Sequence, residues 1–489
     1  MRILSISQDK DLDKNSLFQF FIGISLFYIS LISWLIFQFP ILFLLISSSF
    51  LFLLIFNDFR WGIYLLVLIV PFSPSIDFIK IGSRSVGLPL EYIVSTMIVL
   101  SWIINKIINV NHKIISNYFN FIIFTFTNII LLSIFRAIIQ VGPSQSISAI
   151  TSFIGLILFI LVFYIILELN LDLNQKLIII KLILAAGAIS SLISLVQYLF
   201  FLDDVYRLEP FFDALLRSEN VKANPNTYAS FQMIVCLSGI GFLKYFKKYW
   251  KYISLLSSSL SLLVILLTKS RSSLLGLIIG LFVIAYFNRL KIIPLLTILL
   301  FIPILLSSQK YLERYSSMWQ IVTSERIHDI FIRLNKKDID WEKIKVMGLE
   351  GYRTDVVSGA LRITAWFDGL ELISNRPVLG YGYKLNYLYS NWQTSENYFL
   401  DIWIMTGLLG FINILLIFYF LLRSSWKRIN SKNQFTYFYS RFYFSFLIAI
   451  TVISLTGSVL FSPKLASYFW ILNSLLFSVP DEKNFNSRS

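Results

Sequence analysis

The sequence predicts an all-α, polytopic integral membrane protein with about 12–14 transmembrane helices and a long helical loop on the outer side. Of the 489 residues, 57% are hydrophobic and only 14% are charged, whereas soluble proteins carry about 25% charged residues. Apolar runs recur along nearly the whole chain, and a helix needs about 20 such residues to cross a bilayer core roughly 30 Å thick. No water satisfies backbone groups there, and the alternation of a transmembrane barrel is missing, so these runs are expected to be helices.

The chain divides into fourteen apolar segments and one long polar segment. The apolar segments are residues 17–36, 40–56, 61–72, 88–104, 118–136, 147–168, 177–200, 224–243, 252–267, 272–286, 292–306, 397–422, 436–458 and 464–479. We expect an N-terminal transmembrane bundle over 1–306, a large periplasmic loop with short helices over 307–396, and C-terminal transmembrane helices with a cytoplasmic tail over 397–489. The first apolar run shows no small-residue cleavage site, so it is expected to be a retained helix and not a signal peptide. Cys236 is the only cysteine, which excludes an intrachain disulfide.

Basic residues in the short loops predict the orientation. One alternate set of loops holds 14 lysines and arginines, among them Lys244, Lys427 and Arg428, and the opposite set holds 7. The richer set is cytoplasmic by the positive-inside rule, which places both termini in the cytoplasm of a bacterial inner membrane. The same clustering explains the net charge of +15 without a nucleic-acid partner.

The polar segment 307–396 then lies on the outer side. It holds 12 basic and 11 acidic residues, so it is nearly neutral. Loops of this length are usually functional. Helices are expected over 309–334 and 359–374, and Pro377 stops the second one because the residue before a proline avoids helical angles.

Two outer stretches open apolar segments. Asn224 and Asn226 flank Pro225 within Ala223–Thr227, where they form either a substrate contact or an Asx turn with a helix cap. Lys269 and Arg271 lie between two apolar segments. An interfacial arginine is a functional candidate, and the alternative is a snorkelling charge at a helix end.

Two further stretches belong to the long loop. Arg362 and Trp366 are four residues apart and share a helix face, and Trp366 is either a sugar-stacking platform or an interface anchor. Glu396 precedes Asn397 where the loop re-enters the membrane. It is either a functional carboxylate or a carboxylate that the helix dipole favours at a helix start. The candidate substrate-binding residues are Asn224, Asn226, Lys269, Arg353, Trp366 and Asn397.

Taken together, these stretches resemble the O-antigen ligase and O-antigen polymerase superfamily. The resemblance covers about residues 200–425. It rests on Asn-Pro-Asn before one span, Ser-Arg opening another, Arg-x-x-x-Trp with Pro-x-x-Gly-x-Gly in a long outer loop, and Asn-x-x-Leu followed by Gly-x-x-Gly at the re-entry. It implies a metal-independent membrane glycosyltransferase without a cofactor. Such enzymes move a glycan from undecaprenyl diphosphate to a glycan or lipid-core acceptor outside the cytoplasm.

The resemblance also implies site residues. Family arginines that engage the diphosphate correspond to Arg271 and Arg362. The family often has a histidine just before the asparagine of the re-entry motif, and this chain departs from the pattern with Glu396. Preorganised arginines suit the negative charge of a departing diphosphate, and a carboxylate suits deprotonation of an acceptor hydroxyl. Glu396 is therefore the expected base, with Asp401 as the weaker candidate.

Metal signatures are poor, so no metal site is predicted. Asp338 and Asp340 form the best acidic pair, but they lie among four lysines and resemble a solvated helix face. A transporter or flippase for a lipid-linked solute is the alternative function. It requires polar groups near the bilayer midplane, where candidates such as Asn128 and Gln197 are sparse.

Overall fold

The computed structural model describes residues 22–26, 29, 41–73, 77–81, 84–87, 89–109, 118–143, 146–200, 225–288, 354–385 and 394–478. Over these residues the chain is α-helical apart from turns, two short 3₁₀ segments and one two-stranded hairpin. The predicted all-α, polytopic class is confirmed. Several of the predicted features lie outside the described residues. They are most of the span 17–36, the span 292–306, the helix 309–334, and the pair Asp338 and Asp340.

Twelve of the predicted spans fall on helices. These are α2 (Ile41–Asn57), α3 (Phe59–Ile69), α4 (Leu90–Asn109), α5 (Tyr118–Val141), α6 (Ile147–Glu168), α7 (Leu173–Phe200), α9 (Pro225–Phe242), α10 (Lys248–Thr268), α11 (Arg271–Asn288), α18 (Tyr398–Arg428), α19 (Gln434–Ser454) and α20 (Pro463–Phe477). Among the described residues, eight helices are long and apolar enough to cross a membrane by length and composition: α4, α5, α6, α7, α10, α11, α18 and α19.

The remaining described elements are short or lie outside the apolar segments. They are η1 (Val70–Phe72), the antiparallel strands β1 (Asp77–Ile81) and β2 (Arg84–Gly87), helix α16 (Thr354–Asn375), and η2 (Val459–Phe461). Helix α16 begins five residues before the predicted start at 359 and ends at Asn375, two residues before Pro377. The predicted stop at this proline is confirmed.

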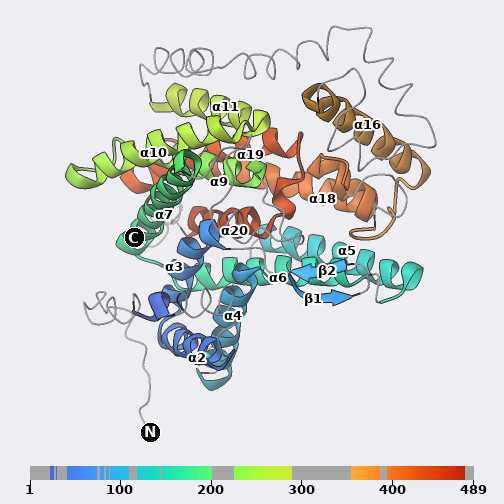
Figure 1. Ribbon diagram of the computed structural model, residues 1–489, viewed down its shortest axis with the longest axis horizontal. Helices are drawn as coiled ribbons and strands as arrows, with labels where there is room; N and C mark the ends of the chain where they lie inside the picture. The colour runs from blue at the N-terminus through green and yellow to red at the C-terminus, as the bar shows by residue number, and fades with distance from the viewer. Residues whose placement is uncertain are drawn as a thin grey trace, which may run out of the picture.

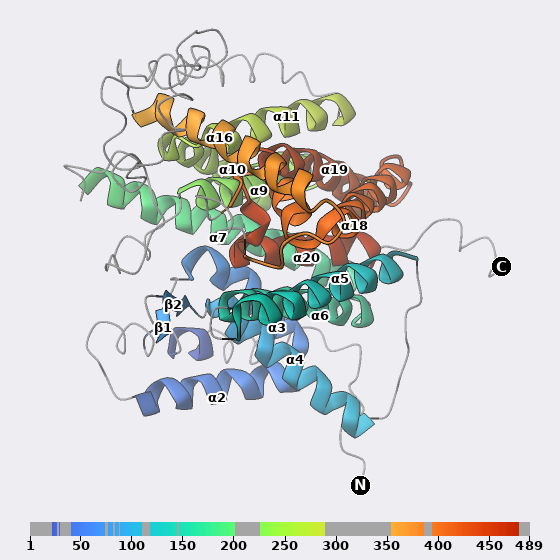
Figure 2. The same cartoon turned by 90° about the vertical axis from the view of Figure 1, so that its right-hand side faces the viewer.

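Helices α18 and α20 join two groups of helices (Figures 1 and 2). On one side α4 packs on α2, α3 and α6, and on the other α9 packs on α7, α10, α11 and α19. Helix α18 contacts α5 and α19, and α20 contacts α6, α9 and α19. The C-terminal helices therefore lie between helices from the first 290 residues, and segments far apart in the sequence meet at one end of the bundle.

Small and hydroxyl-bearing residues bring α9 and α10 close together. The Ser254 hydroxyl donates to the Gly239 carbonyl at 2.7 Å, and a Cβ at Gly239 would lie 2.1 Å from Ser258 Oγ. About two turns earlier on α9, Gln232 Oε1 accepts from Ser191 of α7 at 3.1 Å and from Ser261 of α10 at 2.8 Å. Small residues and satisfied polar groups are what hold helices together where lipid removes the hydrophobic driving force.

Helix α18 is broken at Gly407, where the backbone is non-helical with φ 74° and ψ −171°. The segment Pro377–Gly382 docks against this break. The Tyr381 amide donates to the Ile404 carbonyl at 2.8 Å, and the Gly382 amide donates to the Met405 carbonyl at 3.0 Å. The Leu408 amide donates back to the Pro377 carbonyl at 2.9 Å. A break in a spanning helix is tolerated when neighbouring protein satisfies the freed backbone groups, and Pro377–Gly382 does so here.

Two glycines make this contact possible. A Cβ at Gly407 would lie 1.9 Å from the Val378 carbonyl oxygen, and a Cβ at Gly380 would lie 2.6 Å from the Ile404 carbonyl oxygen. Both residues also have positive φ values, 74° and 66°. The glycines of the Pro-x-x-Gly-x-Gly stretch therefore join the end of α16 to the middle of α18, and this junction fixes both helices relative to each other.

Candidate functional site

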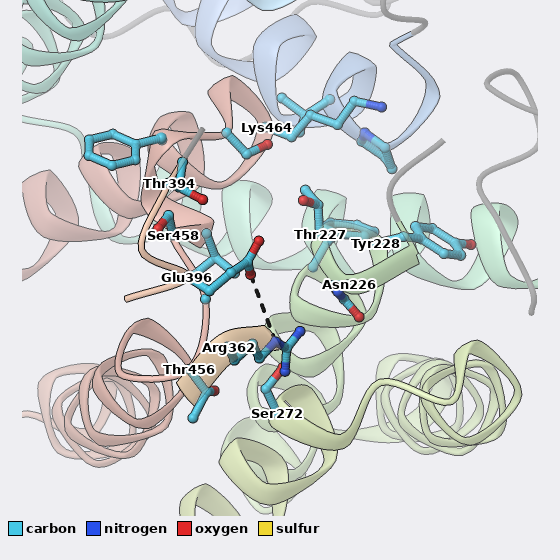
Figure 3. Close-up of a pocket in the computed structure, with 17 residues that line it drawn as sticks. Asn226, Thr227, Tyr228, Ser272, Arg362, Thr394, Glu396, Thr456, Ser458 and Lys464 are labelled. Carbon is cyan, nitrogen blue, oxygen red and sulfur yellow. Dashed lines mark ion pairs between the residues drawn. The ribbon is translucent and has the colours of Figure 1, made fainter. Parts of the chain in front are cut away.

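One cavity of about 340 Å³ opens where the predicted outer ends of several helices meet (Figure 3). Its walls come from η1, the start of α9, the start of α11, helix α16, the residues before α18, and the segment from the end of α19 to the start of α20. The lining residues are Val70, Pro71, Asn226, Thr227, Tyr228, Phe231, Ser272, Arg362, Thr394, Glu396, Thr456, Gly457, Ser458, Val459, Phe461, Ser462 and Lys464. Five of the predicted outer loop ends thus share one cavity.

Arg362 and Glu396 face each other across this cavity, as Figure 3 shows. Arg362 Nε lies 3.9 Å from Glu396 Oε2, and the two side chains are 26% and 45% exposed. This distance allows an ion pair but is too long for a hydrogen bond. No hydrogen bond joins either side chain to another described residue. Both charged groups are therefore open to a ligand that enters the cavity.

The wall next to Arg362 consists of Asn226 and Thr227 from α9 and Ser272 from α11. Hydroxyl groups hold the two helix starts together. Ser273 Oγ lies 3.4 Å from the Asn226 carbonyl oxygen, to which it donates, and 3.1 Å from Ser230 Oγ. Asn226 and Ser272, 46 residues apart in the sequence, therefore line the cavity together.

Thr456, Ser458 and Lys464 also line the cavity, although no sequence motif marks them. They lie at the end of the predicted span 436–458 and at the start of the predicted span 464–479, in a region without a cluster of charge. The signal that was available is Lys464, a basic residue at the predicted outer end of an apolar segment. It adds a second cationic side chain to the cavity lining.

Glu396 is presented by an unusual backbone at the start of α18. Its φ of 54° is left-handed, and Asn397 follows as the N-cap, with Oδ1 accepting from the Phe399 amide at 3.0 Å and the Leu400 amide at 3.2 Å. Asn397 therefore has a structural role, and the predicted substrate contact through it stays a prediction. The cap turns the chain so that Glu396 faces the cavity while Tyr398 and Phe399 are buried.

Asp401 is fully buried in the first turn of α18, with 0% exposure. Its Oδ1 accepts from the Ser395 amide at 2.7 Å, and its Oδ2 accepts from the Ser458 hydroxyl. Asp401 is not among the residues that line the cavity. This position does not suit the weaker role of general base that the sequence suggested for it.

Lys384 is a further cationic residue close to the first turn of α18, and it is not among the lining residues of the cavity. Its ammonium lies 4.4 Å from the centroid of the Phe461 ring, and Phe461 lines the cavity. Burial lowers the pKa of the Lys384 ammonium, and the negative charge of Asp401 opposes that lowering. The Phe461 ring therefore contacts the Lys384 ammonium and also lines the cavity.

The other candidate residues lie around the cavity or outside the described chain. Arg271 is the first residue of α11, directly before the lining residue Ser272, but it is not itself among the lining residues. Lys269 has a left-handed φ of 54° and ends α10. Trp366 lies one turn beyond Arg362, partly buried, and does not line the cavity. Asn224 and Arg353 lie outside the described residues.

No group of three or more histidine, cysteine, aspartate or glutamate side chains is close enough to hold a metal ion within the described ranges. What the cavity offers instead is one carboxylate, two cationic side chains and several hydroxyl and amide groups. This set suits a ligand that carries both phosphate and sugar hydroxyl groups, because guanidinium and ammonium groups bind phosphate oxygens.

One family model matches the central part of the chain. Residues 256–415 match the family model described as O-antigen ligase. The matched segment contains Arg271, Arg362, Glu396 and the Gly407 break, so the resemblance predicted from the motifs is confirmed there. Asn226, Ser458 and Lys464, which complete the cavity, lie outside the match. A search of curated proteins finds no match to the chain.

Proposed function

We propose, from the match of residues 256–415 to the family model described as O-antigen ligase, that the chain is a membrane glycosyltransferase. It transfers a glycan from an undecaprenyl-diphosphate carrier to an acceptor hydroxyl at the periplasmic face of the bacterial inner membrane. The observation that carries the proposal is the pairing of Arg362 and Glu396 in one polar cavity built from helix ends.

The cationic side chains stabilise the leaving group in this proposal. As the bond between the anomeric carbon of the glycan and the phosphate oxygen breaks, its electron pair passes to the diphosphate, which gains negative charge. Arg362 is placed in the cavity to bind that charge, with Arg271 beside the cavity-lining Ser272. Donors fixed in advance stabilise a developing charge without reorganisation, which is why they lower the barrier.

Glu396 activates the acceptor. Its carboxylate accepts the proton of the attacking hydroxyl while the new bond between the acceptor oxygen and the anomeric carbon forms. The ion pair with Arg362 is long, at 3.9 Å, and so a donor diphosphate can replace Glu396 as the partner of Arg362. Binding of the donor thereby frees the carboxylate for the acceptor. A growing glycan or a lipid core supplies the hydroxyl.

The position of the cavity supports the periplasmic assignment. The lining residues come from the long loop 307–396 and from helix ends that adjoin the short loops with fewer basic residues, and the basic cluster of Lys427 and Arg428 lies at the other end of α18. By the positive-inside rule the cavity end is the outer end. A carrier whose diphosphate lies at that membrane surface reaches the cavity without moving its head group through the bilayer.

Transfer by the purified, reconstituted chain tests this proposal. The donor is a synthetic oligosaccharide on undecaprenyl diphosphate, and the product is the glycosylated acceptor. We expect Arg362→Ala to lower the rate by roughly 10²–10³-fold, the usual loss when one donor to a developing oxyanion is removed. Arg362→Lys is expected to restore little, because a point charge does not reproduce the planar fork. Arg271→Ala is expected to fall in the same range.

The matched control is Arg423→Ala, an exposed arginine near the basic end of α18. It removes the same charge from the same protein and is expected to leave transfer unchanged. Equal activity of wild type, Arg362→Ala and Arg423→Ala would refute the proposed role of the cavity. Absence of transfer by the folded wild type with every acceptor tested, together with no binding of the donor, would refute the function itself.

A further inference from the structure

Asp401 joins two walls of the cavity from behind. One oxygen of its carboxylate accepts from the backbone amide of Ser395, and the other accepts from the hydroxyl of Ser458. Ser395 precedes Glu396 directly, while Ser458 is itself a lining residue that comes from the segment before η2. These two walls are 63 residues apart in the sequence, and a single buried carboxylate connects them.

A carboxylate without exposure is costly to bury, so its bonds must compensate for lost hydration. Asp401 is 0% exposed, and both of its oxygens receive a hydrogen-bond donor from the protein. Hydrogen bonds to a charged acceptor are stronger than neutral ones. The two contacts therefore restrain the segments before α18 and before η2 more firmly than neutral contacts would.

The restraint acts directly on Glu396. With the Ser395 amide held by Asp401 and the Asn397 side chain capping α18, the residue between them has its backbone fixed on both sides. The Ser395 hydroxyl adds a bond of 3.1 Å to the Asn397 carbonyl. Glu396 adopts the left-handed φ of 54° within this frame, a conformation that non-glycine residues seldom adopt without such support.

We infer that Asp401 is a positioning residue that holds the Glu396 carboxylate against Arg362 and the acceptor. The inference rests on the proposed function and adds to it a residue that touches neither substrate. In this role the two carboxylate oxygens of Asp401 only accept hydrogen bonds from Ser395 and Ser458. Asp401 does not take up the proton of the acceptor substrate's hydroxyl. An asparagine of the same shape keeps the oxygen that faces the Ser395 amide, and the Ser458 hydroxyl can turn to accept from its amide group.

Three variants of the full-length chain, Asp401→Ala, Asp401→Asn and Ser458→Ala, test the inference in the reconstituted transfer assay. We expect Asp401→Ala to lower kcat by about 10²-fold with little change in the donor KM, the scale of loss from misplacing a reacting group by about 1 Å. Asp401→Asn is expected to retain most of the rate. Ser458→Ala removes one of the two contacts and is expected to fall between them. If Asp401→Ala does not fold, Ser458→Ala and Asp401→Asn carry the comparison.

A double variant separates positioning from a general structural role. In the Glu396→Gln background, Asp401→Ala is expected to lower kcat by less than about 3-fold, because residues that act as a unit are not additive. The matched control is Asp172, an exposed carboxylate that accepts from the Gln175 amide at the start of α7. Asp172→Ala is expected to leave kcat unchanged in both backgrounds. A full 10²-fold loss by Asp401→Ala in the Glu396→Gln background would overturn the inference.

Hydrogen–deuterium exchange measures the restraint without any transfer. Exchange of the peptide containing Ser395 is expected to accelerate in Asp401→Ala and to stay at the wild-type rate in Asp401→Asn. Unchanged exchange in Asp401→Ala would overturn the positioning role whatever the protein's activity. Accelerated exchange in a protein whose wild type transfers no glycan would instead count against the proposed function alone. A loss of kcat in Asp401→Asn as large as in Asp401→Ala would make Asp401 a proton acceptor and would also overturn the inference.

Discussion

Replacing Gly407 by alanine tests how the two charged side chains of the cavity are held together. Arg362 lies on α16 and Glu396 lies directly before α18, and the docking of Pro377–Gly382 against the break at Gly407 joins these helices. The added methyl group would lie 1.9 Å from the Val378 oxygen and 2.4 Å from the Val378 carbonyl carbon. These are backbone atoms, so no side-chain rotation relieves the contact.

The expected cost follows from two contributions. A non-glycine residue at φ 74° and ψ −171° occupies a region used almost only by glycine, which costs about 1–3 kcal/mol. If the docked segment moves away, the three backbone hydrogen bonds from Tyr381, Gly382 and Leu408 are weakened or lost, at about 0.5–1.5 kcal/mol each. Gly407→Ala should therefore destabilise the docked state by about 2.5–7.5 kcal/mol.

Thermal unfolding of the purified protein and the transfer assay together measure the consequence. Local undocking frees α16, so we expect a transfer rate at least about 10²-fold lower, as for a displaced reacting group. The Tm should fall less than a full loss of about 2.5–7.5 kcal/mol implies, since the remaining bundle does not depend on this junction.

Gly142→Ala is the matched control. Gly142 also has a positive φ, 81°, but a Cβ there meets no atom within 4 Å. It therefore carries the conformational cost without the collision, and we expect full activity and a small decrease in Tm. Wild-type transfer and stability in Gly407→Ala would refute the argument that this junction sets the distance between Arg362 and Glu396.

Three more predictions follow from the site and the topology. Glu396→Gln keeps the shape of the side chain and removes the base, so turnover should fall more than donor binding. Glu396→His should retain appreciable transfer. Wild-type turnover in Glu396→Gln would mean that Glu396 is only a carboxylate at a helix start. Transfer by the purified protein should survive EDTA, and a loss that Mg²⁺ or Mn²⁺ restores would contradict the metal-independent mechanism. Cysteines placed in the segment 307–396 should react with an impermeant thiol reagent in intact cells. Labelling of cysteines at 427–432 instead would invert the topology. The native Cys236 is buried and should stay unlabelled.

The helices and the convergence of polar stretches were predictable because each depends on local sequence. Apolar runs locate the spans whatever their neighbours, and alternation along the chain assigns Asn226, Ser272, Arg362 and Glu396 to one side of the membrane. Residues that lie at the same end of adjacent spans lie close together once the bundle packs. These four residues do line one cavity, and the side of the membrane on which it opens stays a prediction.

The contacts that shape the cavity were not predictable because they join residues distant in sequence. Hydropathy indicates a continuous span over 397–422, and only the docked Pro377–Gly382 segment explains a break at Gly407. As a carboxylate, Asp401 was a chemically suitable base. Its burial and its bond to Ser458 depend on a loop with no motif, so the sequence did not indicate them. Arg271 has the right position along the chain, yet it is Ser272 that lines the cavity.

A structure of the chain with bound undecaprenyl diphosphate, the carrier product of the proposed reaction, tests the central claim most directly. Cryo-electron microscopy of the protein in a lipid nanodisc, with and without this ligand, is the measurement. We expect the two phosphates in the cavity with Arg362 as a direct partner, and Glu396 separated from Arg362 beyond the 3.9 Å of the free protein. Phosphates bound elsewhere, with the Arg362–Glu396 pair unchanged, would contradict it.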